Sequence, residues 1–382
     1  MSPPTPRLPM AGPSTRSLVR RYLLPIHRWV GLSAGLLLAW MALTGAGMAL
    51  QPQLAPRIDR ALLVVDHCVE PLPLDVLADA ARAVHPAGQA NFLWLRPDST
   101  ASAMLRFTDN ATVYLDPCSG APLGQQHKYG GVFGRLEQLH RFKFIANGSL
   151  VTGTGVIVAV LGLLLGGLGL WWASRPPVGV PARAVATQRS PRARALRRHR
   201  SVGIWALVIV LASALTGLPK ALDWYHAAVL ALAGSTPEPP PPTSAAVDSQ
   251  SSPISLQDAW TRVRAVVPEV QEARLYVPRK AGTAIEVELI ERGAPHTQAY
   301  TRVYLDAHSG EVLQLRPYSR SSAGHKLLGW MLAWHRGLLG GAAGQLVLIG
   351  GMLAVLFLAW TGVSSDLRRR FARSASAARS RP

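Results

Sequence analysis

The sequence predicts an α-helical integral membrane protein with four transmembrane helices, two α+β modules outside the membrane, and an internal tandem duplication. Three observations support this fold class. Apolar stretches of about 20 residues, enough to cross a bilayer, recur four times, and arginine-rich segments flank them on one side. A motif at the start of the first stretch also recurs 172 residues later. The four stretches cover residues 30–50, 149–172, 202–218 and 343–363.

The formal net charge of +19 is concentrated in three short segments. Residues 1–28 hold five Arg and no acid, residues 174–200 hold eight Arg and no acid, and residues 364–382 hold six Arg and one Asp. Lys and Arg are enriched on the cytoplasmic side of membrane helices. We therefore expect a multi-pass protein of the bacterial inner membrane with both termini in the cytoplasm. The basic excess is a topology signal, so nucleic acid is not an expected partner, whereas the lipid bilayer is.

These segments set the expected order of the chain. The apolar part of the first helix exceeds that of a usual signal peptide, so we interpret it as a permanent span. The predicted order is a basic cytoplasmic N-terminus (1–25), a first span (26–50), a first periplasmic module (51–130), an interfacial helix and second span (131–173), a basic cytoplasmic loop (174–198), a third span (199–218), an interfacial helix, Pro-rich linker and second periplasmic module (219–323), an interfacial helix and fourth span (324–363), and a basic cytoplasmic tail (364–382).

The internal duplication is visible in both the helices and the modules. Residues 27–31 read His-Arg-Trp-Val-Gly and residues 199–203 read His-Arg-Ser-Val-Gly, and each helix continues without a gap to a Thr-Gly pair. Outside the membrane, residues 113–120 and 303–310 share the pattern Val-Tyr-Leu-Asp-x-x-Ser-Gly. The Thr-Gly pairs at Thr44, Thr216 and Thr361 are typical of closely packed membrane helices.

Each copy of the module is predicted to contain one helix followed by three strands. A helical pattern with strand-like runs predicts a small open sheet with one covering helix. The Asp-x-x-Ser-Gly ending predicts a turn into a further strand, and the prolines at 237–242 predict a stiff linker. The expected helices are 74–84 and 255–267, and the expected strands are 92–95, 103–107, 112–115, 273–277, 285–290 and 302–305.

Both cysteines of the chain, Cys68 and Cys118, lie in the first module. That module faces an oxidising compartment in the predicted topology, which favours a disulfide between them. The alternative is a pair of free buried thiols.

Four histidines are each followed by arginine and lie near the ends of apolar runs: His27, His140, His199 and His335. Repeats with the same in-out direction are related by an axis along the membrane normal, so equivalent residues share one depth. His27 and His199 then lie at the cytoplasmic level, and His140 and His335 at the periplasmic level. The 17 residues from His27 to Thr44 rise about 25 Å as a helix, so the two levels are too far apart for one metal to bind all four histidines. The histidines therefore predict two sites with two ligands each.

Haem b fits such sites better than zinc or copper does. Zinc requires four ligands, and Glu137 is the one Cys, Asp or Glu within a few residues of these histidines. Haem requires two axial ligands, an apolar slot and cations beside its propionates. We expect two haem b groups with the histidine pairs as iron ligands and Arg28, Arg200, Arg141 and Arg336 beside the propionates. The alternative is that His-Arg pairs anchor helix ends in the headgroup layer.

The other histidines receive weaker interpretations. His127 and His325 precede the periplasmic pair by about ten residues, and they are alternative ligands, residues at a substrate entry, or surface residues without a role. We expect His67, His85, His296 and His308 to be solvated.

The His-Arg-Trp-x-Gly helix start, the Leu-Thr-Gly helix end and the module ending together resemble the PepSY-associated transmembrane family over residues 20–365. The resemblance implies an inner-membrane protein with PepSY-like modules. Some members are haem-containing reductases of ferric siderophores, and the length and layout are similar to those of the FoxB-type ferrioxamine reductases. Other members have no assigned chemistry.

The resulting functional expectation is a di-haem reductase. Electrons from a quinol or a separate reductase cross the membrane and reduce a ferric siderophore, such as a ferrioxamine, in the periplasm. No catalytic acid or base is needed, because one-electron transfer is the chemistry of the cofactor. Tyr318 and Trp330 are further candidates for the substrate pocket. The alternatives are a membrane-anchored peptide-binding, protease-binding or regulatory protein without redox activity, and a transporter or electron-transfer subunit.

Overall fold

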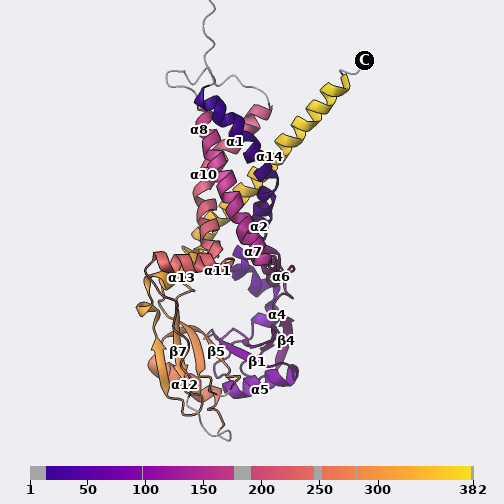
Figure 1. Ribbon diagram of the computed structural model, residues 1–382. Coiled ribbons are helices and arrows are strands. Elements are labelled where there is room, and N and C mark those ends of the chain that lie inside the picture. The colour runs from indigo at the N-terminus through magenta and orange to yellow at the C-terminus, as the bar shows by residue number, and fades with distance from the viewer. Residues whose placement is uncertain (1–13, 97, 176–190, 245–251, 281, 380–382) are drawn as a thin grey trace, which may run out of the picture. The chain divides into compact units, whose positions relative to one another are not determined.

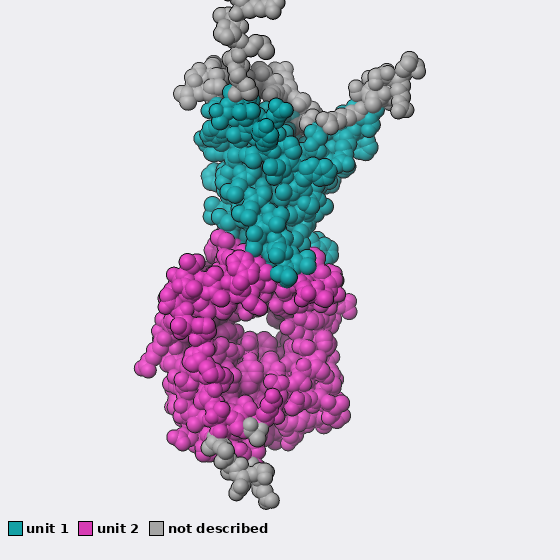
Figure 2. All heavy atoms as spheres, in the orientation of Figure 1, with its two compact units in different colours: residues 1–43, 150–214, 349–382 teal, residues 44–149, 215–348 magenta. Residues whose placement is uncertain are grey.

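The computed structural model divides into two compact units, and it describes residues 14–96, 98–175, 191–244, 252–280 and 282–379. Unit 1 comprises residues 1–43, 150–214 and 349–382, and unit 2 comprises residues 44–149 and 215–348 (Figure 2). Parts of three predicted basic segments, residues 1–13, 176–190 and 380–382, lie outside the described residues.

Long apolar helices match the predicted spans. Three are long and apolar enough to cross a membrane, namely Gly148–Ala173, Ala193–Lys220 and Gly341–Ala372. A fourth span is formed if α1 (Thr15–Leu32) and α2 (Ala34–Ala49), which meet at a bend of 44°, count as one. At the bend the Ser33 hydroxyl donates to the Trp29 carbonyl at 2.9 Å, a side-chain bond of the kind that bends helices. The chain is therefore a membrane protein with three or four apolar helices.

One of these spans departs from uniform α-helix. The segment before the middle loop runs through α7 (Gly148–Ala159), a π-helical stretch (Val160–Leu165) and α8 (Gly166–Ala173). The segment after that loop is α10 (Pro191–Gly217). The last helix, α14 (Gly341–Arg379), extends well beyond the predicted end at residue 363, so most of the basic tail is helical. Its arginines continue the helical spacing without a Gly or Pro to stop it.

Unit 2 contains one eight-stranded sheet in the order β4-β3-β2-β1-β5-β6-β7-β8. Every neighbouring pair is antiparallel, and the two modules meet where Phe92 of β1 pairs with Tyr276 of β5. The predicted strands are present, and the Asp-x-x-Ser-Gly turns lead into β4 and β8. The joining of the modules was not predicted. The strands are β1 (Ala90–Leu95), β2 (Ala103–Phe107), β3 (Ala111–Leu115), β4 (Pro122–His127), β5 (Val270–Tyr276), β6 (Ile285–Glu291), β7 (Tyr300–Leu305) and β8 (Val312–Arg316).

One face of the sheet is covered by α5 (Leu74–Val84) and α12 (Leu256–Val266), which lie on the same side (Figure 1). Alternate strand residues such as Leu93, Leu105 and Val287 are fully buried beneath them, as the two-residue period of a strand requires. The helices cap each other: the Asp75 carboxylate accepts from the Leu256 amide at 2.8 Å, and Gln257 accepts from the Leu74 amide at 3.2 Å.

Short helices complete unit 2. They are α3 (Gln51–Ile58), α4 (Arg60–Leu63), α6 (Val132–His140), η2 (Leu218–Lys220), α11 (Asp223–Leu232), η3 (Tyr318–Arg320) and α13 (Ala323–His335). The predicted break before the second span is present: Asn147 has a φ of 56°, and a Cβ on Gly148 would lie 1.8 Å from the Phe142 carbonyl oxygen. Cys68 and Cys118 are joined by a disulfide, with their Cα atoms 5.7 Å apart.

Candidate functional site

His27 and His199 face each other within unit 1. His27 lies on α1 and His199 on α10, and their ring centroids are 6.4 Å apart. Both side chains are partly buried among helices that the sequence predicted as spans. Two helices that are separated by 172 residues in the sequence thus bring one imidazole each to a common point.

Thr361 of α14 fixes the orientation of the His199 ring. Its hydroxyl donates to the Phe357 carbonyl at 2.9 Å and lies 2.7 Å from His199 Nδ1. Because a hydroxyl has a single proton, Thr361 must accept from the Nδ1–H of His199 when it donates to Phe357. The ring then carries its proton on Nδ1 and leaves the Nε2 lone pair available to a metal.

His27 lacks such a partner. Its Nδ1 is buried and makes no hydrogen bond within the described part of the chain. In the first copy of the repeat, the position equivalent to Thr361 is Gly166, by the 195-residue offset that relates His140 to His335. Gly166 lies against His27, since a Cβ on it would lie 3.6 Å from His27 Nδ1. Gly167 likewise lies against His27 as Gly362 lies against His199. The two rings therefore have matched surroundings that differ by one hydroxyl.

His140 and His335 form the corresponding pair in unit 2. They lie at the C-terminal ends of α6 and α13, and their ring centroids are 6.1 Å apart. His140 Nδ1 lies 3.0 Å from the Thr44 hydroxyl of α2. A Cβ on Gly217 of α10 would lie 2.5 Å from His335 Cε1, so glycine is needed for this ring to approach the helix.

Both ring separations fit two axial ligands of one iron. A metal–imidazole bond is about 2.0 Å, and the ring centre lies about 1.1 Å beyond the nitrogen, so two opposed ligands have centroids about 6.3 Å apart. The observed values are 6.4 and 6.1 Å. The buried, unsatisfied Nδ1 of His27 is a second sign of a ring held for a purpose other than protein contacts, because buried polar atoms are normally hydrogen-bonded.

The donor set does not favour a four-ligand metal. Among the described residues, no group of three or more His, Cys, Asp or Glu side chains is placed to hold a metal ion. Two imidazoles meet the needs of haem but not those of a tetrahedral zinc site.

The four arginines that follow the histidines have different surroundings. Arg28 forms an ion pair with Asp366, and Arg141 pairs with Glu137 at 2.9 Å. Arg200 and Arg336 form no ion pair with any described residue. Lys220 lies near Arg141 and Arg336 and adds to the positive charge there. Arg200, Arg336 and Lys220 are therefore better placed to receive propionates than Arg28 and Arg141 are.

His127 and His325 are not part of either histidine pair. His127 Nε2 lies 3.2 Å from the Asp109 carbonyl, and His325 Nδ1 lies 2.7 Å from the Ser322 hydroxyl. The His127 side chain is exposed, and the His325 side chain is partly exposed. The structure thus brings together His140 and His335, and it uses the two preceding histidines in local turns.

The expectation that His296 is solvated was wrong. It is 6% exposed, its Nε2 lies 3.0 Å from the Tyr318 hydroxyl, and its ring lies 4.6 Å from that of Trp330. Burial lowers the pKa of His296 and raises the pKa of Tyr318. The turn that carries it packs onto α13, which the local sequence could not reveal. Tyr318 and Trp330, expected in a substrate pocket, contact this histidine instead.

The sheet face opposite α5 and α12 carries charged and aromatic residues. In the second module, Glu288 accepts from Arg302 at 2.9 Å and lies 3.5 Å from Arg274. Burial raises the pKa of Tyr276 and Tyr304 to about 12, and burial with the charge of Glu288 raises the pKa of Glu286. Figure 2 shows unit 2 hollowed by an opening.

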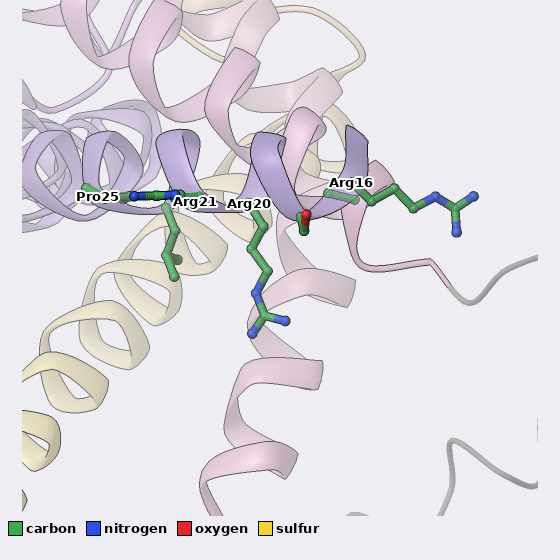
Figure 3. A pocket seen from close by; sticks show the side chains of 7 residues that line it. Arg16, Arg20, Arg21 and Pro25 are labelled. Carbon is green, nitrogen blue, oxygen red and sulfur yellow. The ribbon is translucent and has the colours of Figure 1, made fainter. Parts of the chain in front are cut away.

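Residues at the start of α1 line a basic pocket in unit 1. Its lining includes Arg16, Arg20, Arg21 and Pro25, with Ala173 from α8. Figure 3 shows Arg16 and Arg20 extending in different directions rather than converging on one point. Such a surface suits diffuse attraction to anionic lipid headgroups better than recognition of one small molecule.

The hydroxyl groups that orient the histidines were not predicted from the sequence. Thr44 and Thr361 were interpreted as helix-packing residues. Thr44 recurs as Thr216 with the 172-residue offset of His27 and His199, and this was the available signal, whereas Thr361 has Gly166 at its equivalent position and offered none.

Comparison with known proteins identifies one family. The model of the family described as PepSY-associated TM region matches residues 24–369. No curated protein matches the chain.

Proposed function

Because the chain belongs to the family of the PepSY-associated TM region, we propose that it is a di-haem b reductase of the bacterial inner membrane. In this proposal it passes electrons from the cytoplasmic side to a ferric siderophore in the periplasm and so releases ferrous iron for uptake. The donor is a quinol or a separate reductase.

The observation that carries the proposal is the pair of facing imidazoles in each unit. The ring separations of 6.4 and 6.1 Å fit one iron between each pair. A headgroup anchor would not require rings from different helices to meet, nor a threonine to fix the proton of His199 on Nδ1. The geometry therefore favours a cofactor over the interfacial alternative.

The residues have separate tasks in this proposal. His27 and His199 hold one haem, and His140 and His335 hold the other. Thr361 and Thr44 keep the rings oriented, as partners of ligating histidines generally do. Arg200, Arg336 and Lys220 neutralise propionates. Bound haem supplies a one-electron carrier, so these side chains need not move protons.

The topology and the duplication support a direction for the electrons. Each half of the chain gives the same order: a helix with His-Arg, short helices, the helix that covers the sheet, four strands, and a second His-Arg before the next long helix. The arginine-rich ends favour an orientation with His27 and His199 toward the cytoplasm. His140 and His335 then serve the periplasmic side, where unit 2 receives the substrate.

Reduction of the metal explains how iron would be released. Transfer of one electron converts ferric to ferrous iron, whose lower charge weakens its bonds to the hard oxygen ligands of a siderophore. The chelator is unchanged by this step, so no bond of the siderophore needs to be broken.

A chemical assay tests the proposal. The full-length protein, reduced under anaerobic conditions, is mixed with ferric chelates and ferrozine. We expect one ferrous ion for each electron that the protein loses, and we expect the absorbance to show the haem becoming oxidised at the same rate. His335→Ala should lose fast iron reduction while retaining one haem. Protein that contains haem but transfers no electron to any ferric chelate would contradict the assignment.

A second candidate function rests on the edges of the sheet. The strand order ends at β4 and β8, and a free strand edge can add a peptide strand by main-chain hydrogen bonds. In that case the chain is a membrane-anchored peptide-binding, protease-binding or regulatory protein, and the purified protein has no Soret absorbance.

A further inference from the structure

Two arginines on the sheet face opposite α5 and α12 lack acidic partners. Arg106 lies on β2, and Arg96 follows β1. Neither forms an ion pair with a described residue, and the Nε atoms of both are buried without a hydrogen bond. Within the described residues, Arg96 makes one hydrogen bond, a long one of 3.4 Å to the Ser102 carbonyl.

The matched position in the second module carries the opposite charge. Arg106 pairs across the strands with Phe92 and Thr112, and Glu288 occupies the corresponding place between Arg274 and Arg302. Glu288 forms ion pairs with both of those arginines. The first module has replaced this central acid with a base, and its neighbours Phe92 and Thr112 have no charge.

The acids around Arg96 and Arg106 form no ion pair with either arginine among the described residues. Arg106 interacts electrostatically with Glu137 without forming an ion pair. The Glu137 carboxylate is already 2.9 Å from Arg141 and 3.9 Å from Lys128. Arg96 interacts electrostatically with Glu272 and Asp98, again without forming an ion pair. Burial lowers the pKa of both guanidinium groups, yet arginine stays protonated in proteins.

The free-energy cost of two partly buried arginines without ion pairs indicates that a ligand binds them. Partly burying a charge without a partner is unfavourable, whereas a planar guanidinium binds carboxylate or other paired oxygens through two hydrogen bonds. Tyr114 of β3 lies within electrostatic range of both arginines and adds a phenol to the group. These residues belong to the hollowed unit 2 (Figure 2).

We propose that Arg96 and Arg106 form an anion-binding site that selects negatively charged ferric chelates, those with carboxylate or catecholate oxygens, over cationic hydroxamate chelates. The proposal rests on the proposed reductase function and narrows its substrate class. Charge recognition at this site would hold the chelate in the unit that contains His140 and His335.

Calorimetric titration with redox-inert gallium tests the site without any electron transfer. The oxidised full-length protein is titrated with gallium(III) tris-catecholate, with the gallium complex of a cationic trihydroxamate, and with inorganic phosphate. We expect the catecholate complex to bind at least about tenfold more tightly than the other two, and added salt to weaken it. Equal binding of the anionic and cationic complexes would overturn the proposal, and so would phosphate that binds as tightly as the chelate.

Variants locate the binding to the arginines. Arg106→Gln should weaken the anionic complex about tenfold, the loss expected for one charge-assisted hydrogen bond, and Arg106→Lys should weaken it less. Arg292→Gln is the control, because Arg292 is exposed and paired with Glu269. If Arg106→Gln does not fold, Arg96→Gln gives the same comparison. Unchanged affinity in a folded arginine variant would refute the site.

The outcomes separate this site from the reductase function. Gallium binding requires no haem, so the site can be present even if the protein carries no cofactor. Conversely, haem and iron reduction can be present while anionic and cationic chelates bind alike. In the second case the reductase function stands and the charge selection fails.

Discussion

At the residue scale, the imidazoles of unit 1 differ in one hydrogen bond. His199 donates from Nδ1 to Thr361, whereas His27 Nδ1 faces Gly166 and has no partner within the described residues. A hydrogen bond from Nδ1–H makes the ligating nitrogen more electron-rich and favours the ferric state of a bound haem. In the proposed di-haem protein, the Thr361 hydroxyl would lower the midpoint potential of the unit 1 haem through His199.

Thr361→Val tests this role of the hydroxyl. The nearly isosteric change removes the acceptor, so we expect the midpoint potential of the unit 1 haem to rise and that of the other haem to stay constant. Spectroelectrochemical titration measures both. Thr154→Val is the control, because the Thr154 hydroxyl donates to the Leu150 carbonyl of its own helix. Equal potentials in wild type and Thr361→Val would contradict the role.

The opposite change supports the same test. Gly166→Ser places a hydroxyl beside His27 Nδ1 and should lower the unit 1 potential. Gly350→Ser serves as its control, because a Cβ there meets no atom within 4 Å.

The sequence predicted the four histidines and their pairing, because a repeat places equivalent residues together. The repeat is gapless for His27 and His199, whereas the offset grows to 195 residues for His140 and His335. It did not predict their hydrogen-bond partners. Thr361 contacts His199 across 162 residues, and its equivalent Gly166 has no hydroxyl, so the repeat gave no reason to connect Thr361 with His199. The burial of His296 likewise depends on packing against Trp330, which is distant in the sequence.

At the element scale, the joining of the two modules determines what the sheet presents. The pairing of β1 with β5 makes one continuous face from residues of both copies. The periodicity of each strand predicted its inward and outward residues, as the buried Leu93 and Leu105 show. It could not predict the edge-to-edge joining, because both modules contain the same kind of strand and main-chain pairing carries little sequence signal.

Glu288→Gln tests the charge network of the second module. Glu288 is the acid between Arg274 and Arg302, and its side chain is 13% exposed. Its loss should lower the free energy of unfolding by about 2 kcal/mol, a drop in midpoint of roughly 5 °C for a unit of this size. Thermal unfolding in detergent measures it. Glu269→Gln, at an exposed pair, should change little, and an equal effect of both variants would contradict the account.

At the scale of the whole molecule, the division into two units matches the division of the histidines. Unit 1 contains His27 and His199, and unit 2 contains His140 and His335. The apolar stretches predicted the long apolar helices. The charge pattern predicts that both termini lie in the cytoplasm, because arginine distribution constrains insertion, and this orientation stays a prediction. The bend between α1 and α2 was not predicted, because it depends on a local hydrogen bond of Ser33.

Counting haem per chain in three forms of the purified full-length protein tests the central claim most directly. Pyridine haemochrome spectra should give two haem b groups for the wild type and one for each of His199→Ala and His335→Ala, with different remaining spectra in the two variants. Absence of a Soret band from the wild type, or loss of the same single haem in both variants, would contradict two separate bis-histidine sites.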